Sequence, residues 1–383
     1  MAETKATKGA SSPPTSPTST PSATTTKIIS SLSELPPLPR YEAILLDQFG
    51  VLHDGVDPYP QSIEATRHLA VSQKRRVVLL SNSSRRAVHA LDKLSSMGFK
   101  REWFYGAVTS GEVAHRLLEA RKRRSEEEGD GNGNGNGAGR EQEAVVLDEQ
   151  GAPLDVSLLG NKCFHVTWGA SHDGARGAVS VDGLGLELVS SPSEADFILA
   201  HGTEAIGGSE GSSPVELEAL KETLERAGRE NGKSVPLLCA NPDIVTVNGA
   251  AGLVAMPGTL ARWYAEAGGR VVLLGKPGPA IYAAAALLLG EEGVSKPTSG
   301  QRFPLLAIGD SLEHDIAGAS GAPFPAEGVE SLFIGGGIHA ATLFPGGEKA
   351  ADDESLDAGA LEQLLASRPA AQRPTLAMSW YRV

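Results

Sequence analysis

The 383-residue sequence predicts an α/β fold built on an open parallel sheet. Two observations carry this prediction. Apolar runs of strand length alternate with segments whose apolar residues have helical spacing, which is the pattern of consecutive βα units. Each run also ends in a polar residue, and open parallel sheets assemble their sites at the carboxyl ends of their strands. The residues at these ends are Asp47, Ser81, Lys276 and Asp310.

The first run, Ile44–Leu46, ends in Asp47 and is followed by Gly50. A carboxylate at the end of a buried strand is costly to desolvate unless it is paired, bound to a metal or exposed to a ligand. Glycine lets the chain turn sharply just past the acid. By itself, Asp47 could equally cap a turn, so its functional interpretation depends on the later runs.

Three later runs repeat this organisation. They are Val77–Leu80 with Ser81 and a helix over 85–97, Val271–Leu274 with Lys276 and a helix over 280–289, and Leu305–Ile308 with Asp310 and Asp315. Each polar residue alone has a simpler interpretation, as a helix cap, a solvated strand end or a turn former. Four such runs in one chain favour a shared site.

Pattern and composition divide the rest of the chain. Thr109 and Glu112 form a predicted capping box for a helix over 111–124, and the Gly/Asn tract that follows is typical of a solvated insertion. The predicted parts are a disordered tail or transit peptide over 1–38, a first core segment over 39–110, the helix and insertion over 111–159, a second α/β unit over 160–265, a second core segment over 266–345 and a C-terminal extension over 346–383.

Composition limits the class of protein. The net charge of −13, without a compensating basic face, argues against nucleic acid as a partner, and no apolar stretch is long enough for a membrane span. Two cysteines, Cys163 and Cys239, cannot form a disulfide framework, so we expect a reducing compartment and buried thiols. A cytoplasmic location is expected. The alternative is a plastid or another organelle, since the first 38 residues are rich in Ser and Thr and poor in acids.

With these motifs, the chain resembles the haloacid dehalogenase (HAD) superfamily, specifically its class IIA hydrolases. This class includes nitrophenyl-phosphatase-like and ribonucleotide-monophosphatase-like proteins. Within that class it is most similar to an uncharacterised HAD-like hydrolase branch. The resemblance extends from Tyr41 to about Thr342, and its motifs are Asp47–Gly55, Leu80–Arg86, Val108–Glu112, Ala240–Asp243, Gly275–Pro277 and Gly335–His339. It implies a Rossmann-like parallel-sheet core with a large α/β cap inserted over 160–265.

The expected chemistry is phosphoryl transfer to a carboxylate. Asp47 would attack phosphorus and hold a covalent aspartyl phosphate. Two anions approach each other in that step, so positive charge must be supplied. Mg²⁺ suits this role because it prefers oxygen ligands. We expect Asp47 and Asp310 as its carboxylates, the backbone carbonyl of Phe49 as a further ligand by resemblance, and Asp315 bracing the site or holding a metal-bound water. Lys276 would neutralise the Asp47/phosphate charge.

Groups of the protein, in addition to the metal, are expected to bind the phosphate oxygens. Ser81, Asn82 and the amides at the start of the following helix are expected to bind them, because a helix N-terminus presents free N–H groups to anions. Asn241 is a further candidate phosphate ligand, with a turn-forming role in Asn241–Asp243 as the alternative. The expected partner is a small phosphorylated metabolite; homodimer formation stays open.

Phe49 departs from the family pattern. Most HAD phosphatases have at this position an aspartate that protonates the leaving group, and phenylalanine cannot transfer a proton. General acid catalysis, typically worth ~10²–10⁴-fold, must then come from elsewhere, with His53 or Asp54 as substitutes, or be absent. The prediction is a HAD-type phosphomonoester hydrolase that is slow. The alternatives are a phosphoester-binding or regulatory protein with little or no turnover, and a hydrolase of substrates with good leaving groups such as acyl phosphates or halides.

Overall fold

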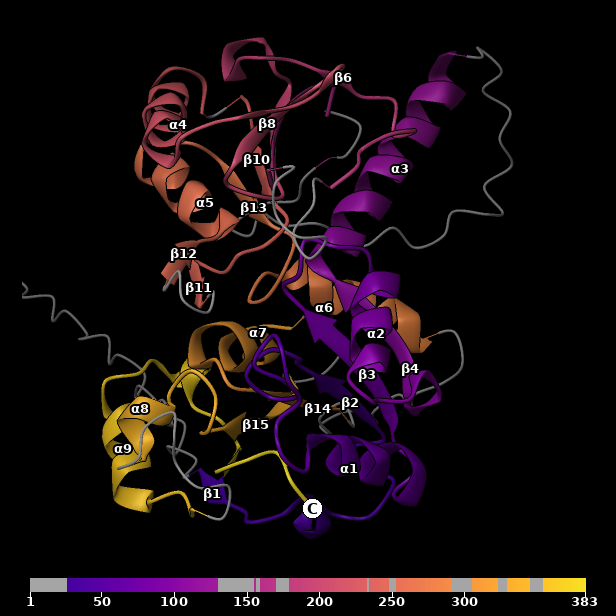
Figure 1. The fold of residues 1–383 in the computed structure, drawn as a ribbon, viewed down its shortest axis with the longest axis vertical. Helices are drawn as coiled ribbons and strands as arrows, with labels where there is room; N and C mark the ends of the chain where they lie inside the picture. The colour runs from indigo at the N-terminus through magenta and orange to yellow at the C-terminus, as the bar shows by residue number, and fades with distance from the viewer. Residues whose placement is uncertain are drawn as a thin grey trace, which may run out of the picture.

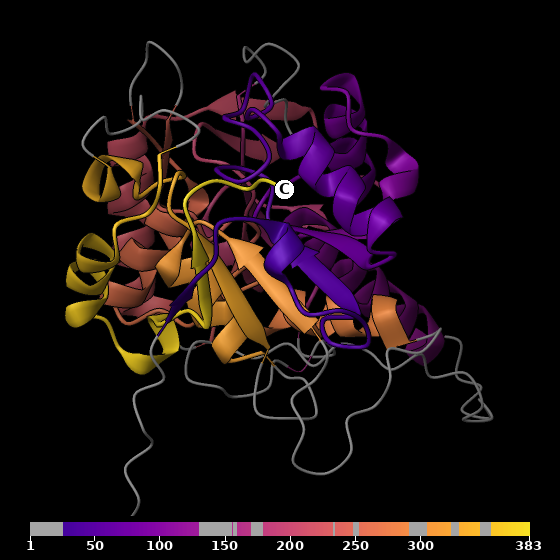
Figure 2. The same ribbon diagram turned by 90° about the horizontal axis from the view of Figure 1, so that it is seen from below.

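The core of the protein is a seven-stranded parallel sheet (Figures 1 and 2). The computed structural model describes residues 26–129, 155, 159–169, 179–232, 234–247, 253–290, 305–322, 329–344 and 354–383. In order across the sheet, the strands are β1 (Lys27–Ile28), β16 (Leu376–Met378), β15 (Glu330–Ile334), β14 (Leu305–Gly309), β2 (Ala43–Leu46), β3 (Arg76–Ser81) and β4 (Phe104–Thr109). The α/β fold class predicted from the sequence is thereby confirmed.

Helices cover both faces of this core sheet. On one face, Ile44 and Leu46 of β2 pack in a buried cluster with residues of α1 (Ser62–Arg67), η2 (His68–Ser72) and α2 (Ala87–Ser96). On the other face, Leu45 of β2 belongs to a cluster with α3 (Ser110–Gly129) and α6 (Pro279–Gly290). The remaining helices of the core are η1 (Leu32–Glu34), η3 (Arg101–Trp103), η7 (Leu312–Ile316), α7 (Ala317–Ser320), α8 (Ala340–Leu343), α9 (Ala358–Ala366) and η9 (Ala370–Gln372).

A second sheet lies beyond α3, in the upper half of Figure 1. Its strands are β13 (Val271–Leu273), β10 (Leu237–Cys239), β7 (Phe197–Ala200), β5 (Lys162–Thr167), β8 (Ala205–Gly208) and β9 (Gly211–Pro214), with β6 (Glu187–Leu188) paired to β5. Helices α4 (Leu217–Asn231) and α5 (Pro257–Glu266) pack on it, η5 (Pro192–Glu194) precedes β7, and β11 (Val245–Val247) and β12 (Leu253–Ala255) form a separate antiparallel pair.

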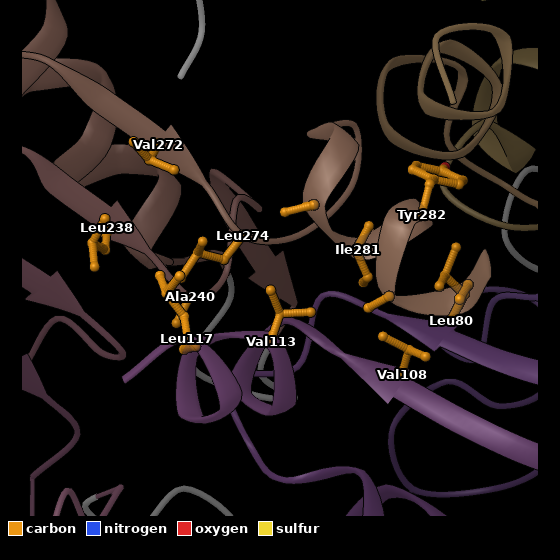
Figure 3. Close-up of a cluster of buried hydrophobic side chains, with 14 of the residues drawn as sticks. Leu80, Val108, Val113, Leu117, Leu238, Ala240, Val272, Leu274, Ile281 and Tyr282 are labelled. Carbon is orange, nitrogen blue, oxygen red and sulfur yellow. The ribbon is translucent and has the colours of Figure 1, made fainter. Parts of the chain in front are cut away.

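One apolar cluster joins the two sheets (Figure 3). Val113 and Leu117 of α3 lie between Val108 of the core and Leu238 and Leu274 of the second unit. Each large aliphatic side chain buried in this way contributes about 1.5–3 kcal/mol relative to exposure. Separating the two sheets would expose several of them at once, so the second unit is packed on the core through α3.

The strand before Lys276 lies in a different sheet from the one expected. Sequence pattern placed Val271–Leu274 in the core, but β13 pairs in parallel with β10, with Leu237 opposite Val271, in the second sheet. That expectation is therefore wrong. A short apolar run carries no signal of which sheet it joins, since the pairing partner is chosen by tertiary contacts. The chain returns to the core only in the loop that contains Lys276.

The prediction of a disordered tail or transit peptide over 1–38 is also wrong for its last residues. β1 pairs in parallel with β16, and Leu32 of η1 is fully buried in the core. Residues 26–38 are therefore part of the fold, and the C-terminal extension contributes β16 to the core sheet. The first 25 residues and the tract over 130–139 lie outside the described residues. Within the part of the chain that the structure describes, no helix combines the length and apolarity needed to span a membrane.

Candidate active site

Three carboxylates converge at the carboxyl ends of two adjacent core strands. Asp47 follows β2 and Asp310 follows β14, which are neighbours in the sheet, and Asp315 lies in the π-helical turn η7 just beyond. One carboxylate oxygen from each of the three lies within 4.8 Å of the other two, and all three residues are buried. The central strands thus bring together the acids that the sequence singled out.

Lys276 reaches into this cluster from the loop after β13. Its Nζ atom lies 2.6 Å from Oδ1 of Asp47 and 2.7 Å from Oδ1 of Asp315, and the side chain is only 3% exposed. Burial alone would lower the pKa of Lys276, but the carboxylates of Asp315 and Asp47 outweigh it and raise the pKa above its ordinary value. The ammonium group is therefore charged and contacts two carboxylates at once.

The cluster contains three carboxyl groups and the ammonium group of Lys276. Burial and the neighbouring Asp315 raise the pKa of Asp47 to about 7, against the opposing effect of Lys276. Burial, Asp47 and Asp315 raise the pKa of Asp310 well above its usual range. A divalent cation would relieve this repulsion, and carboxylate oxygens are the donors that Mg²⁺ prefers. The carbonyl oxygen of Phe49 accepts no backbone hydrogen bond from the described residues, so it remains available as a ligand.

Two glycine-containing loops enclose the carboxylate of Asp310. Gly50 has a φ of +81°, and a Cβ atom there would lie 2.0 Å from Oδ2 of Asp310. A Cβ atom at Gly337 would lie 2.1 Å from the same oxygen. The amide of Ile338 donates a hydrogen bond of 2.8 Å to Oδ2. Asp310 is therefore held in one orientation by backbone that approaches too closely for any side chain.

Replacing Gly337 by alanine tests this packing. We expect Gly337→Ala to displace the Asp310 carboxylate and to weaken divalent-cation affinity about 10–100-fold, as is typical when groups that orient a metal ligand are disturbed. Titration calorimetry with Mg²⁺ measures the change directly. Gly290→Ala is the matched control, because nothing lies within 4 Å of a Cβ atom there. Equal affinities for the two variants would mean that Asp310 is not a metal ligand.

The hydroxyl oxygen of Ser81 accepts two hydrogen bonds from neighbouring residues. The side chain of Gln48 donates to Oγ of Ser81 over 2.6 Å, and the amide of Ser83 donates to it over 3.2 Å. With both interactions accepted by the oxygen, the O–H group is left to donate, which suits a phosphate oxygen. Gln48 was not anticipated from the sequence. Its Oε1 atom is buried without a hydrogen-bond partner among the described residues.

The two asparagines behave differently from the phosphate ligands expected. The amide of Asn82 is occupied by protein: Oδ1 accepts from the backbone N–H of Lys276 over 2.7 Å, and Nδ2 donates to the Lys276 carbonyl over 3.1 Å and to Asp243 over 2.8 Å. Oδ1 of Asn241 accepts from the amide of Asp243 over 3.0 Å. For Asn241 this is the turn-forming geometry that the sequence left open.

Phe49, His53 and Asp54 lie on a flap beside the carboxylates. The Phe49 ring is 37% exposed and meets His53 edge-on, with ring centroids 5.9 Å apart. His53 is buried, and burial lowers its pKa to about 4. Asp54 accepts hydrogen bonds from the amides of Val56 and Asp57, which hold its pKa below the usual range despite some burial. Near neutral pH, His53 is unprotonated and Asp54 is ionised, so neither is suited to donate a proton.

Known proteins share this architecture. A model of the haloacid dehalogenase-like hydrolases matches residues 44–147. A haloacid dehalogenase-like family hydrolase from Brucella suis is 26% identical, with 92% of this chain and 98% of that chain covered and a TM-score of 0.58. A glycerol phosphate phosphatase from Mycobacterium tuberculosis, in complex with calcium, is 19% identical, with 89% and 74% covered and a TM-score of 0.51.

A p-nitrophenyl phosphatase from Archaeoglobus fulgidus is 16% identical, with 90% of this chain and 97% of that chain covered and a TM-score of 0.50. At these identities the two phosphatases show a shared fold. A comparison with curated protein sequences finds no match. Fold and site together define a hydrolase with a carboxylate-rich centre at the end of a parallel sheet and a second α/β unit packed beside it. Over residues 44–147 the chain matches the haloacid dehalogenase-like hydrolases, and its fold is similar to that of a member of this family over most of its length.

Proposed function

We propose that this hydrolase cleaves phosphomonoesters through a covalent phosphate on Asp47, with Mg²⁺ as cofactor. The observation that carries the proposal is the contact of Lys276 with Asp47 inside a cluster of three buried carboxylates. A carboxylate among other anions is a poor nucleophile toward phosphate unless cations neutralise the approach. Lys276 supplies one cation from the protein, and the excess of carboxylates provides the ligands for another.

Each residue then has a defined task. Asp47 is the nucleophile, and Lys276 holds it and offsets the charge that the phosphoryl group brings. Asp310 and the carbonyl of Phe49 would hold Mg²⁺ together with Asp47. When bound there, the ion neutralises phosphate oxygens and orients the phosphoryl group. Ser81 donates its O–H to a phosphate oxygen. Asp315 fixes Lys276 from the other side and accepts the amide of Ser311 over 3.1 Å.

Proton supply sets the preferred leaving group. With phenylalanine at position 49, and with His53 and Asp54 in unsuitable protonation states, an alcohol must leave with little protonation. Aryl phosphates and acyl phosphates meet this condition, whereas alkyl phosphates do not. The apolar side chains at the entrance of the site also favour an aryl leaving group. Phe49 and Ile338 are 37% and 59% exposed, and each is next in sequence to one of the two glycines that enclose Asp310. An apolar leaving group would cover both side chains.

The dependence on leaving group tests the proposal. We expect p-nitrophenyl phosphate to be hydrolysed at least about 100-fold faster than a simple alkyl phosphate, the size of effect that general acid catalysis typically supplies. Phe49→Asp should narrow this ratio by improving the alkyl ester, and Phe49→Leu, which keeps an apolar side chain without adding an acid, is the control. Equal rates on both esters in the native protein would show that another residue supplies the proton.

The alternative functions give distinct results in the same assay. A phosphoester-binding protein without turnover would bind inorganic phosphate in the presence of Mg²⁺ but release no nitrophenol. A dehalogenase would act on haloacids in EDTA. The buried excess of carboxylates favours the metal-dependent reaction over the latter, because a metal-free site gains nothing from a third acid within 4.8 Å.

A further inference from the structure

The backbone of the loop that carries Lys276 is hydrogen-bonded to the core by the side chain of Asn82. The amide of Asn82 pairs with both backbone groups of Lys276, accepting its N–H over 2.7 Å and donating to its carbonyl over 3.1 Å. These are the two hydrogen bonds that a neighbouring strand would make. Asn82 is buried and follows β3 of the core sheet, whereas Lys276 follows β13 of the second sheet.

We propose that Asn82 is a positioning residue for Lys276 and that Asp243 holds Asn82 in this role. The inference rests on the proposed function of Lys276. A lysine side chain is flexible, and its ammonium group is placed reproducibly only when its backbone is fixed. Because β13 belongs to the second sheet, the core strands do not fix it. Asn82 supplies the missing connection at a point next to Ser81.

Close packing around Gly275 supports this role. A Cβ atom at Gly275 would lie 2.5 Å from Oδ1 of Asn82 and 2.7 Å from Cδ of Pro242. The backbone just before Lys276 therefore lies directly against the Asn82 amide and against the segment that follows β10. No space remains in which the loop could slide along Asn82 while keeping its hydrogen bonds.

Asp243 fixes the orientation of the Asn82 amide. Its Oδ1 atom accepts from Nδ2 of Asn82 over 2.8 Å and lies 3.3 Å from Nδ1 of His314 in η7. Without an acceptor at this place, the amide could rotate and present the wrong group to Lys276. Asp243 is itself held by Asn241, whose Oδ1 accepts the Asp243 amide. Through Asp243, the segment after β10 of the second sheet thereby contacts both Asn82 and His314 of the core.

The variants Asn82→Ala and Asp243→Ala test this arrangement. Asp243 is the safer position, because its side chain is 35% exposed and its loss leaves no cavity in a core. We expect each variant to lower kcat for p-nitrophenyl phosphate about 10–100-fold, the usual consequence of a misplaced catalytic group, with a smaller change in KM. Asp243→Asn keeps the acceptor oxygen and should restore near-native turnover. Asp92→Ala, on an exposed position of α2, is the control.

A second readout does not require turnover. Acetic anhydride labelling of Lys276, followed by peptide mass spectrometry, should become several-fold faster in Asn82→Ala and Asp243→Ala, while labelling of Lys221 stays constant. The double variant should label Lys276 and hydrolyse substrate no differently from Asn82→Ala, because both changes act through one contact. Unchanged Lys276 labelling in both single variants, or equal damage from Asp243→Asn and Asp243→Ala, would overturn the inference. A native protein without turnover would refute the proposed function, and the labelling would still decide the positioning role.

Discussion

Asp47→Asn should lower the turnover of p-nitrophenyl phosphate by on the order of 10³-fold or more, the scale seen when a nucleophile is removed. The asparagine has the same shape, and its side-chain oxygen can still accept from Lys276, so the fold should persist. Its amide cannot attack phosphorus or carry a covalent phosphate. Steady-state rates and circular dichroism measure the two effects. Asp92→Asn on the exposed face of α2 is the matched control.

Metal removal should have an effect of similar size. EDTA is expected to abolish turnover in the native protein, and added Mg²⁺ should restore it, since the single ammonium group of Lys276 faces the three carboxyl groups of the cluster. After rapid acid quenching, the native protein should carry covalent phosphate on Asp47. The Asp47→Asn variant should carry none. Turnover that persists in the asparagine variant or in EDTA would contradict the mechanism.

The strands that carry the acids were predictable because they are central and parallel. β2, β3 and β14 are buried on both faces, so each is a continuous apolar run that ends in a polar residue. The edge strand β1 and its neighbour β16 were not predicted. These strands are only two and three residues long, and they lie near opposite ends of the chain. Such pairing depends on tertiary contacts rather than on local pattern.

The residues of the candidate site also fall into those that could be predicted from the sequence and those that could not. Asp47, Lys276, Asp310 and Asp315 were anticipated from their places after apolar runs, and the structure brings all four together. Asn82 was given a ligand role from its neighbours in sequence, whereas its partner in the structure is the backbone of Lys276, 194 residues away. The roles of Gln48 and Ile338 could not be read from the sequence either, because they depend on which segments meet at the Ser81 hydroxyl and at the Asp310 carboxylate.

Lys276→Met should both lower turnover and destabilise the metal-free protein. Methionine fills much of the lysine's volume but leaves the carboxylates of Asp47 and Asp315 facing each other without their shared cation. Breaking a buried ion pair by removing one partner typically costs about 3–5 kcal/mol. Turnover should fall by roughly 10²–10³-fold, as for other losses of preorganised charge.

The destabilisation should depend on pH in a defined direction. The pKa of Asp47 is already about 7 in the native state, well above its ordinary value, and loss of the lysine raises it further. The folded protein then binds a proton that the unfolded chain releases near pH 4, so stability falls as pH rises from about 4 through the folded pKa. In EDTA, the thermal midpoint of Lys276→Met should therefore lie further below that of the native protein at pH 8 than at pH 5.

Mg²⁺ distinguishes this explanation from simple loss of packing. The ion would replace the missing positive charge, so it should raise the midpoint of Lys276→Met at pH 8 more than that of the native protein. Lys100→Met, at an exposed position, is the control and should respond like the native protein. If Lys276→Met in EDTA were equally destabilised at both pH values and indifferent to Mg²⁺, the carboxylates would not be ionised together. The site would then lack the ionised carboxylates that would attract a divalent cation.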